Sequence, residues 1–262
     1  MAWTGQYPGD EPVRVNKWLA QSGVCSRREA EGLIAGGLVR IDGEVVADAG
    51  RKILPGQTLV LSDDATRHLD SAMTVLLNKP MGYVSGQPEP GKVPAARLLT
   101  AAAQLGDGPL PSARDSLPPV GRLDEDSRGL LILSTDGVVA KAVIGPDADL
   151  PKTYQVWVRG TLTDSKIARL RFGLSLDGRA LKRAEVEQLG PLCLRFVLRE
   201  GRNRQIRRMC EMLDLRVMDL WRTHIGPLSL EGLPEGRWRH LTPAERTALI
   251  SASAAGSGQA GT

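Results

Sequence analysis

The sequence predicts an α+β protein, with a mixed, mainly antiparallel sheet and flanking helices, preceded by a small domain of order ααβββ. Predicted strands outnumber helices after residue 73 and do not alternate regularly with them, which disfavours a doubly wound parallel sheet. The chain has 262 residues, 42% of them hydrophobic, so it exceeds one typical domain and can bury a sizeable core. A polar stretch, SDDATRHLDSA, separates the two parts.

Residues 13–62 form the first predicted domain. Apolar residues in VRVNKWLAQSG recur at helical spacing and predict a short helix. A second helix is predicted in SRREAEGLIAGG, where Ser26 and Glu29 fit the S-x-x-E capping box and paired glycines follow the apolar face. VRIDGEVV then alternates around Asp42 and Gly43, a strong hairpin signal, and ILPGQTLVL supplies a further turn and strand.

The second predicted domain covers residues 73–249. It begins with the strand MTVLLNKP and a loop rich in Pro and Gly, followed by GRLDEDSRG, the strand GLLILST, a helix through VVAKAV and the strand KTYQVWVRG. RALKRAEVEQL and PLCLRFVL are then predicted as strands, RNRQIRRMCEML as a helix and MDLWRTHI as a strand. We expect residues 1–12 to be a flexible tail, 63–72 a linker, and 250–262 a disordered tail of small and polar residues.

Composition narrows the class of partner and the compartment. Lys and Arg outnumber Asp and Glu by 34 to 30, which gives a net charge of +4 and favours an anionic partner. Three scattered cysteines fit neither a disulfide framework nor zinc-ligand spacing, so a reducing cytoplasm is expected. No stretch approaches about 18 apolar residues and no signal pattern opens the chain, so we expect a soluble protein with no membrane partner.

Arginines are concentrated in residues 199–208, which hold five of them against one glutamate at the amino end of a predicted helix. The helix macrodipole disfavours cations there, so an anion is expected to compensate them, either an RNA phosphate or a carboxylate from elsewhere in the fold. A plain solvated basic face is the alternative. Arg204 and Arg208 point away from the predicted core face. The first domain has a weaker basic set: Arg14, Lys17, Arg27, Arg28 and Arg40.

The segment GRLDEDSRG permits three interpretations: a polar turn, a metal or paired-carboxylate site, or one catalytic carboxylate held by arginine. Metal binding is the weakest, because its three acids are adjacent and no histidine lies nearby. Among the acids, Asp124 is the best candidate to face a pocket, since Leu123 precedes it and a buried strand follows. Tyr154 in KTYQVWV is either a stacking platform for a base or, as the pattern favours, a core aromatic.

Six segments in one order give a more specific indication. GRLDEDSRGLLILSTDG is similar to the catalytic motif of the pseudouridine synthases of the RsuA, RluB and RluF branch. VNKWLAQSGVCSRREAEGLIAGGLVRIDG resembles the S4 RNA-binding domain that these enzymes carry at the amino end. The same branch is also resembled by four further segments: LLNKPMGYV, KTYQVWV, EGRNRQIRRMCEML and RTHIGPLSLEGLPEGRWRHLT. The resemblance therefore extends from Val13 to about Thr242.

The resemblance implies isomerisation of uridine to pseudouridine in RNA, with no cofactor and no metal. It makes Asp124 the catalytic aspartate, Tyr154 the tyrosine that stacks on the target base, Arg207 the partner of that aspartate, and Arg122 a residue that holds the displaced RNA. Asp126 is given no chemistry, and Asp126→Asn is expected to keep most activity. The residues expected to bind RNA are Arg14, Lys17, Arg27, Arg28, Arg204 and Arg208.

Within the branch, NRQIRRMCEML and WRTHI most resemble the RluF type, so the expected partner of this monomer is 23S ribosomal RNA. The alternatives are the same reaction on 16S ribosomal RNA or tRNA, and a non-catalytic S4-type RNA-binding or ribosome-assembly protein. A hydrolase of nucleosides or sugars is disfavoured, because such enzymes usually need two separated acids. Whether Asp124 acts as a nucleophile or as a base is left open.

Overall fold

The computed structural model describes residues 2–86, 90–112 and 117–257. Contacts divide the chain into two compact units, Met1–Thr74 with Ser134–Lys141 and Val75–Leu133 with Ala142–Thr262. Within the described residues, no helix combines the length and the apolar character that crossing a membrane requires.

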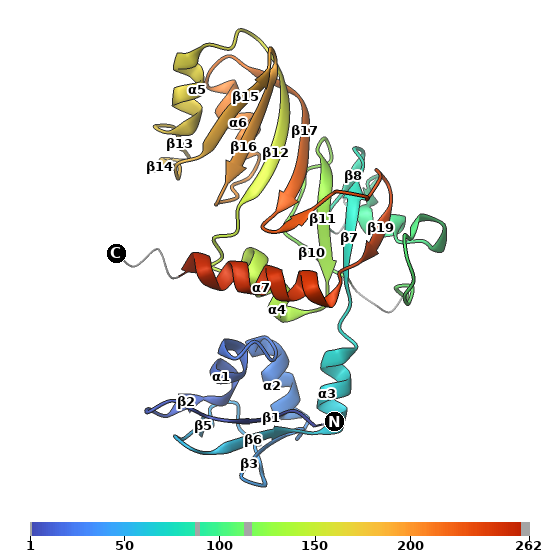
Figure 1. Cartoon of the computed structure of the whole chain (residues 1–262), viewed down its shortest axis with the longest axis vertical. Coiled ribbons are helices and arrows are strands. Elements are labelled where there is room, and N and C mark those ends of the chain that lie inside the picture. The colour runs from blue at the N-terminus through green and yellow to red at the C-terminus, as the bar shows by residue number, and fades with distance from the viewer. Residues whose placement is uncertain (1, 87–89, 113–116, 258–262) are drawn as a thin grey trace. The chain divides into compact units, whose positions relative to one another are not determined.

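The first unit is a small sheet that shares one apolar core with its helices (Figure 1). Its main sheet has the strand order β1-β6-β3-β4, and β2 pairs with β5. The strands are β1 (Thr4–Gln6), β2 (Val13–Arg14), β3 (Val39–Ile41), β4 (Glu44–Val45), β5 (Lys52–Ile53) and β6 (Thr58–Leu61). The helices are α1 (Val15–Gln21), α2 (Arg27–Ala35) and α3 (Asp63–Asp70).

Local sequence signals explain the centre of this unit. The capping box of α2 is confirmed, because Ser26 Oγ accepts from the Glu29 amide at 3.2 Å and the Glu29 carboxylate accepts from the Ser26 amide at 2.6 Å. The predicted hairpin is also confirmed, with β3 and β4 joined by Asp42 and Gly43. Both turn residues have positive φ, 48° and 89°, as a tight two-residue hairpin requires.

Two expectations about the ends of this unit were wrong. Residues 1–12 are not simply a flexible tail, because β1 pairs antiparallel with β6 and the Trp3 ring lies 5.9 Å from that of Trp18. The rings of Trp3 and Tyr7 pack against the Trp18 side chain of α1, and this contact fixes the segment. Residues 63–72 are not an irregular linker, because Ser62 caps α3 by accepting from the Ala65 amide at 3.1 Å. The predicted order ααβββ is therefore incomplete.

The second unit is built on a larger sheet of order β15-β16-β12-β17-β11-β7-β19, with β10 beside β11 and β18 beside β17 (Figure 1). β11 pairs with β17 in parallel, whereas β12, β15, β16 and β17 pair antiparallel, so the predicted mixed, mainly antiparallel sheet is confirmed. β8 and β9 form a separate pair, as do β13 and β14.

The strands of this part of the chain are β7 (Thr74–Lys79), β8 (Tyr83–Val84), β9 (Val93–Pro94), β10 (Pro119–Val120), β11 (Arg128–Ser134), β12 (Lys152–Arg159), β13 (Ser175–Leu176), β14 (Arg179–Ala180), β15 (Glu185–Gly190), β16 (Cys193–Leu198), β17 (Arg216–Ile225), β18 (Leu228–Ser229) and β19 (Trp238–His240). The helices are α4 (Gly137–Ile144), α5 (Asp164–Arg171), α6 (Gln205–Glu211) and α7 (Pro243–Ser257), and two 3-10 helices cover Ala95–Leu98 and Ala101–Ala103.

Helix α7 corrects the expected tail. Residues 250–257 are helical rather than disordered, while 258–262 lie outside the described residues. The helix starts at a reciprocal cap, in which Thr242 Oγ1 accepts from the Glu245 amide at 3.2 Å and Glu245 accepts from the Thr242 amide at 3.0 Å. Leu249 is fully buried and anchors its middle.

One apolar cluster of the second unit packs the strands β12, β15 and β16 against α5 and α6. Val156 and Val158 of β12 are buried with Phe196 of β16, as period-two alternation predicts. From α6 and the residues after it come Ile206, Met209, Cys210 and Leu213, all of which are buried. The apolar face predicted for this helix is therefore confirmed, and its first turn is placed at the end of the central strands.

The parallel contact between β11 and β17 depends on Gly129. Its φ is 113°, and it lies opposite Arg222. A Cβ atom here would overlap the Arg222 carbonyl oxygen and would lie 2.8 Å from the Arg222 amide nitrogen, and neither backbone atom can move aside alone.

We therefore predict that Gly129→Ala lowers the free energy of unfolding of this unit by about 3 kcal/mol or more, because it adds backbone strain to an overpacked contact. Thermal unfolding measures the effect. Gly201→Ala is the control, because a Cβ there meets no atom within 4 Å and Gly201 is not in the left-handed region. Equal melting temperatures for the two variants would contradict this account of the strand pair.

Candidate active site

A short charged turn connects β10 to β11, and its backbone is tied down at several points. Ser85 Oγ accepts from the Leu123 amide at 2.9 Å and donates to the Leu123 carbonyl at 2.7 Å. The Ser127 amide donates to the Asp124 carbonyl at 3.1 Å, and the Gly82 amide donates to the Glu125 carbonyl at 2.8 Å. These bonds hold the backbone of Asp124 while its side chain stays about one-third exposed.

This turn borders a pocket of about 500 Å³ in the second unit. The pocket contains most of the predicted site residues of this unit: Arg122, Asp124, Tyr154, Arg204 and Arg207. Further charged lining residues are Lys152, Arg199, Glu200, Arg202 and Arg222. Seven described lining residues are thus Lys or Arg and two are acidic, which makes the pocket a receptor for anionic groups. Arg208 does not line it in the described structure.

Arg207 does not form the ion pair with Asp124 that we expected. Its side chain is only 9% exposed, and its Nη2 donates to the Asp126 carbonyl at 2.6 Å and to Ser127 Oγ at 3.2 Å. The same nitrogen lies 3.3 Å from the Asp126 carboxylate. Arg207 lies beside the charged turn, as the motif predicts, but Asp126 and Ser127 are the residues of the turn that it contacts.

Arg204 contacts Asp124 instead. Its Nη1 lies 3.4 Å from the Asp124 carboxylate, and its two terminal nitrogens donate to the two Asp126 oxygens at 3.1 and 2.9 Å. Partial burial alone would raise the pKa of Asp126, but the hydrogen bonds from Arg204 and the charges of Arg207 and Arg204 outweigh it and hold that pKa below its usual value.

Other arginines of residues 199–208 also have carboxylate partners. Arg208 donates to both oxygens of Asp177 at 2.9 and 2.6 Å. Arg199 bonds Asp149, and Arg202 donates to carbonyls of the β13–β14 hairpin at 2.7 to 3.1 Å. The expected compensation by carboxylates elsewhere in the fold is therefore confirmed, and a plain solvated face is wrong for this segment.

Tyr154 meets the condition for a core aromatic, which the sequence pattern favours, and also the condition for a stacking platform. It packs against the core cluster that contains Val156 and Phe196, and it is half-buried at the edge of the pocket. A ring whose one side rests on the core has a fixed orientation and can present its other side to a base.

Two buried cations near the turn were missed from the sequence. Lys79 is fully buried and its Nζ donates to the carbonyls of Pro80 and Tyr83 at 2.9 and 2.8 Å. Arg222 donates to the carbonyls of Leu130 and Arg122 at 2.8 and 3.2 Å. The apolar run before Lys79 was the available signal that a charge is buried there. Arg222 thus holds the backbone of the pocket residue Arg122, and Lys79 holds the turn that follows β7.

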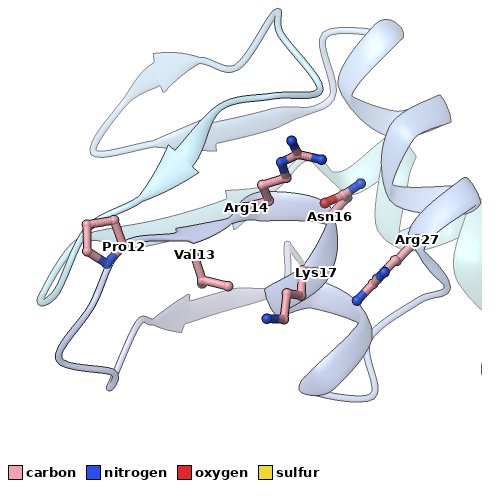
Figure 2. Close-up of a pocket in the computed structure, with 6 residues that line it drawn as sticks. All are labelled: Pro12, Val13, Arg14, Asn16, Lys17 and Arg27. Carbon is pink, nitrogen blue, oxygen red and sulfur yellow. The ribbon is translucent and has the colours of Figure 1, made fainter. Parts of the chain in front are cut away.

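A second pocket, of about 420 Å³, lies in the first unit (Figure 2). Figure 2 shows Arg14 at the end of β2, Lys17 in α1 and Arg27 at the start of α2 among its lining residues. Arg28 and Arg40 are also exposed, and Arg40 bonds the Gly43 carbonyl at 2.9 Å. The structure therefore gathers three of the predicted RNA contacts of the first domain at one concave surface.

Comparisons with known proteins define the class to which this fold and these pockets belong. Residues 73–212 match the family described as RNA pseudouridylate synthase, and residues 13–59 match the S4 domain. The chain belongs to the RNA pseudouridylate synthase family. It is an RNA pseudouridine synthase, an enzyme that isomerises uridine to pseudouridine in RNA.

Individual relatives support the same class. The chain is 34% identical to the dual-specificity RNA pseudouridine synthase RluF of Escherichia coli O157:H7, over 90% of this chain and 78% of that protein. It is 35% identical to an uncharacterized RNA pseudouridine synthase of Aquifex aeolicus, over 92% and 94% of the two chains. A crystal structure of a pseudouridylate synthase matches with a TM-score of 0.60 and 25% identity, over 90% of this chain and 99% of that one. The resemblance to the RsuA, RluB and RluF branch is thus confirmed.

The burial of Lys79 leads to a prediction about pH. Burial, partly opposed by Asp124 and Asp126, lowers the pKa of Lys79 from 10.5 to about 8. Between pH 8 and pH 10.5, Lys79 is protonated in the unfolded chain but largely neutral in the folded protein. The free-energy penalty for burying its charge is therefore complete below pH 8 and disappears as the pH rises toward 10.5.

The stability of the wild type relative to Lys79→Met should therefore increase from pH 7.5 to pH 10.5, by up to about 3 kcal/mol. Thermal unfolding of both proteins across this range measures the difference, and the Met variant cancels the titration of all other groups. A difference that stays constant or falls with pH would show that Lys79 is not a desolvated cation.

Proposed function

We propose that Asp124 is the catalytic residue and that Tyr154 stacks on the target uracil. The observation that supports this is the availability of the Asp124 carboxylate in a cationic pocket. The other acid of the pocket, Glu200, accepts from the Lys182 amide and from Gln205 at 2.9 and 3.0 Å and pairs with Arg202, so its oxygens are occupied. Asp124 has one ion-pair contact, at 3.4 Å, among the described residues.

The geometry suits a uridine that leaves its stack. Unstacking a base costs a few kcal/mol, which stacking on Tyr154 and phosphate contacts to the cationic rim can offset. Arg122 is exposed at this rim, and its backbone is held by Arg222. The reaction breaks the bond from uracil N1 to the sugar carbon and forms one from uracil C5 to the same carbon; C5 releases a proton and N1 takes one up, so the composition does not change. The Asp124 carboxylate lines the pocket that would receive the flipped nucleotide, and it is the group that would act on the sugar or the base.

We further propose 23S ribosomal RNA as the substrate, with the enzyme acting as a monomer in the cytoplasm. The support is the 34% identity to RluF over most of the chain, together with the motifs NRQIRRMCEML and WRTHI. In the first unit, the S4 domain binds RNA backbone through Arg14, Lys17 and Arg27, with Arg28 beside them at the exposed start of α2. Cations around a concave surface provide phosphate contacts that position RNA without reading its sequence.

Asp124→Asn is predicted to retain RNA binding and lose pseudouridine formation. Asparagine keeps the shape and can still accept from Arg204, but it lacks the negative charge. The assay is tritium release from uracil C5 of a 23S ribosomal RNA fragment, with RNA affinity measured in parallel. Glu125→Gln is the matched control, because Glu125 pairs with Lys92 at 3.3 Å and does not line the pocket. Normal tritium release by Asp124→Asn would reject the catalytic assignment.

For the S4 domain, the variant Arg14→Gln/Lys17→Gln/Arg27→Gln should lower RNA affinity more than tenfold at low salt. Each lost phosphate contact should also reduce the log-log salt slope by about 0.7, or about 2 for all three. Titrations of labelled RNA at several salt concentrations measure both quantities.

The control for net charge is Arg51→Gln/Lys52→Gln/Arg67→Gln, which removes three exposed cations of the same unit that do not line its pocket. We expect a smaller loss of affinity from this variant. If both triple variants weaken binding equally, the pocket has no special role and only the overall charge matters.

A further inference from the structure

Asp126 lies at the centre of a chain of alternating charges at the mouth of the pocket. Its carboxylate receives two hydrogen bonds from Arg204 and lies 3.3 Å from Arg207. Its carbonyl accepts from Arg207 at 2.6 Å. Arg204 in turn reaches Asp124 at 3.4 Å. The order of contacts is therefore Arg207, Asp126, Arg204, Asp124.

The two arginines differ in how they are fixed. Arg207 is 9% exposed and also bonds Ser127 and the Val217 carbonyl, so it keeps its place without the Asp126 carboxylate. Arg204 is 42% exposed and precedes α6 with a left-handed backbone, φ 49°. Its hydrogen bonds from the guanidinium go to the two oxygens of Asp126.

We infer that Asp126 is a positioning residue, whose carboxylate orients the Arg204 guanidinium so that this cation lies against the catalytic carboxylate of Asp124. Two parallel hydrogen bonds fix both the place and the plane of a guanidinium, which a single contact at 3.4 Å does not. An exposed arginine without this fork would lose its orientation to rotamer entropy. The inference rests on the proposed catalytic role of Asp124.

The same geometry separates two effects of removing the Asp126 charge. Arg204 would lose its orientation toward Asp124, so the chemical step slows. Its guanidinium would remain at the pocket and stay available to RNA phosphate, so RNA binding is not weakened. In contrast to the expectation from the sequence, Asp126→Asn should therefore lower kcat by about tenfold or more, since small misplacements at a reacting centre reach about a hundredfold. KM for RNA should stay within about threefold of the wild type.

A double-mutant cycle tests whether Asp126 acts through Arg204. The proteins are the wild type, Asp126→Asn, Arg204→Gln and the double variant, assayed for kcat and KM by tritium release from a 23S ribosomal RNA fragment. We expect the double variant to have the kcat of Arg204→Gln within about twofold, because the second change removes an orientation that is already lost. Glu125→Gln is the control, and its small effect should be the same in both Arg204 backgrounds.

Asp126→Glu is the second variant. It keeps the negative charge, so it tests the inference even if Asp126→Asn is unstable. Its kcat should lie between those of Arg204→Gln and the wild type. A kcat for Asp126→Asn like that of Glu125→Gln, losses that multiply in the double variant, or a kcat for Asp126→Glu as low as that of Arg204→Gln would each overturn the inference. If Asp124→Asn is inactive and the losses of kcat from Asp126→Asn and Arg204→Gln multiply in the double variant, only the role of Asp126 is rejected. If Asp124→Asn is active, the proposed catalytic residue itself is rejected.

Discussion

The close parallel contact between β11 and β17 determines where the charged turn and the arginine-rich start of α6 lie. At Gly129 the two backbones approach until no side chain fits between them. The charged turn leads directly into β11, and α6 precedes β17, so this contact brings the turn and the arginine-rich helix start to the same end of the sheet. Moving either strand by one residue would turn the following side chains to the opposite face. The pocket thus depends on a contact that contains no catalytic atom.

Electrostatic pairing at this site serves orientation more than stability. The pair of Arg204 with Asp126 is half-exposed, and a pair of this kind contributes about 0 to 1 kcal/mol. Its geometry is nevertheless specific, because two hydrogen bonds fix the plane of the guanidinium, as they also do for Arg208 on Asp177 outside the pocket. The buried cations Lys79 and Arg207 also donate to backbone carbonyls, which tie them to the main chain.

The sequence was most informative where the signal is local. The capping box at Ser26 and the hairpin at Asp42 need only neighbouring residues, and both were predicted correctly. The resemblance of the ordered motifs selected Asp124, Tyr154 and Arg207 as site residues, and the structure places all three in one pocket. The contacts of Asp126 with Arg204 and Arg207 were not predictable, because the local sequence does not show which of three adjacent carboxylates faces an arginine about eighty residues later in the chain. Helix α5 was missed because Ile167 and Leu170 alone form its buried face.

The pairing of β1 with β6 has a consequence for folding during synthesis. Thr4 lies opposite Val60, so the first strand has no partner until the ribosome has released some sixty residues. Long-range strand pairing of this kind is slow relative to helix formation, and α1 and α2 can form on the nascent chain before the sheet closes. The S4 fold is nevertheless complete in sequence well before Gly121–Gly129 is translated. The RNA-binding domain can therefore fold while the catalytic domain is still being made.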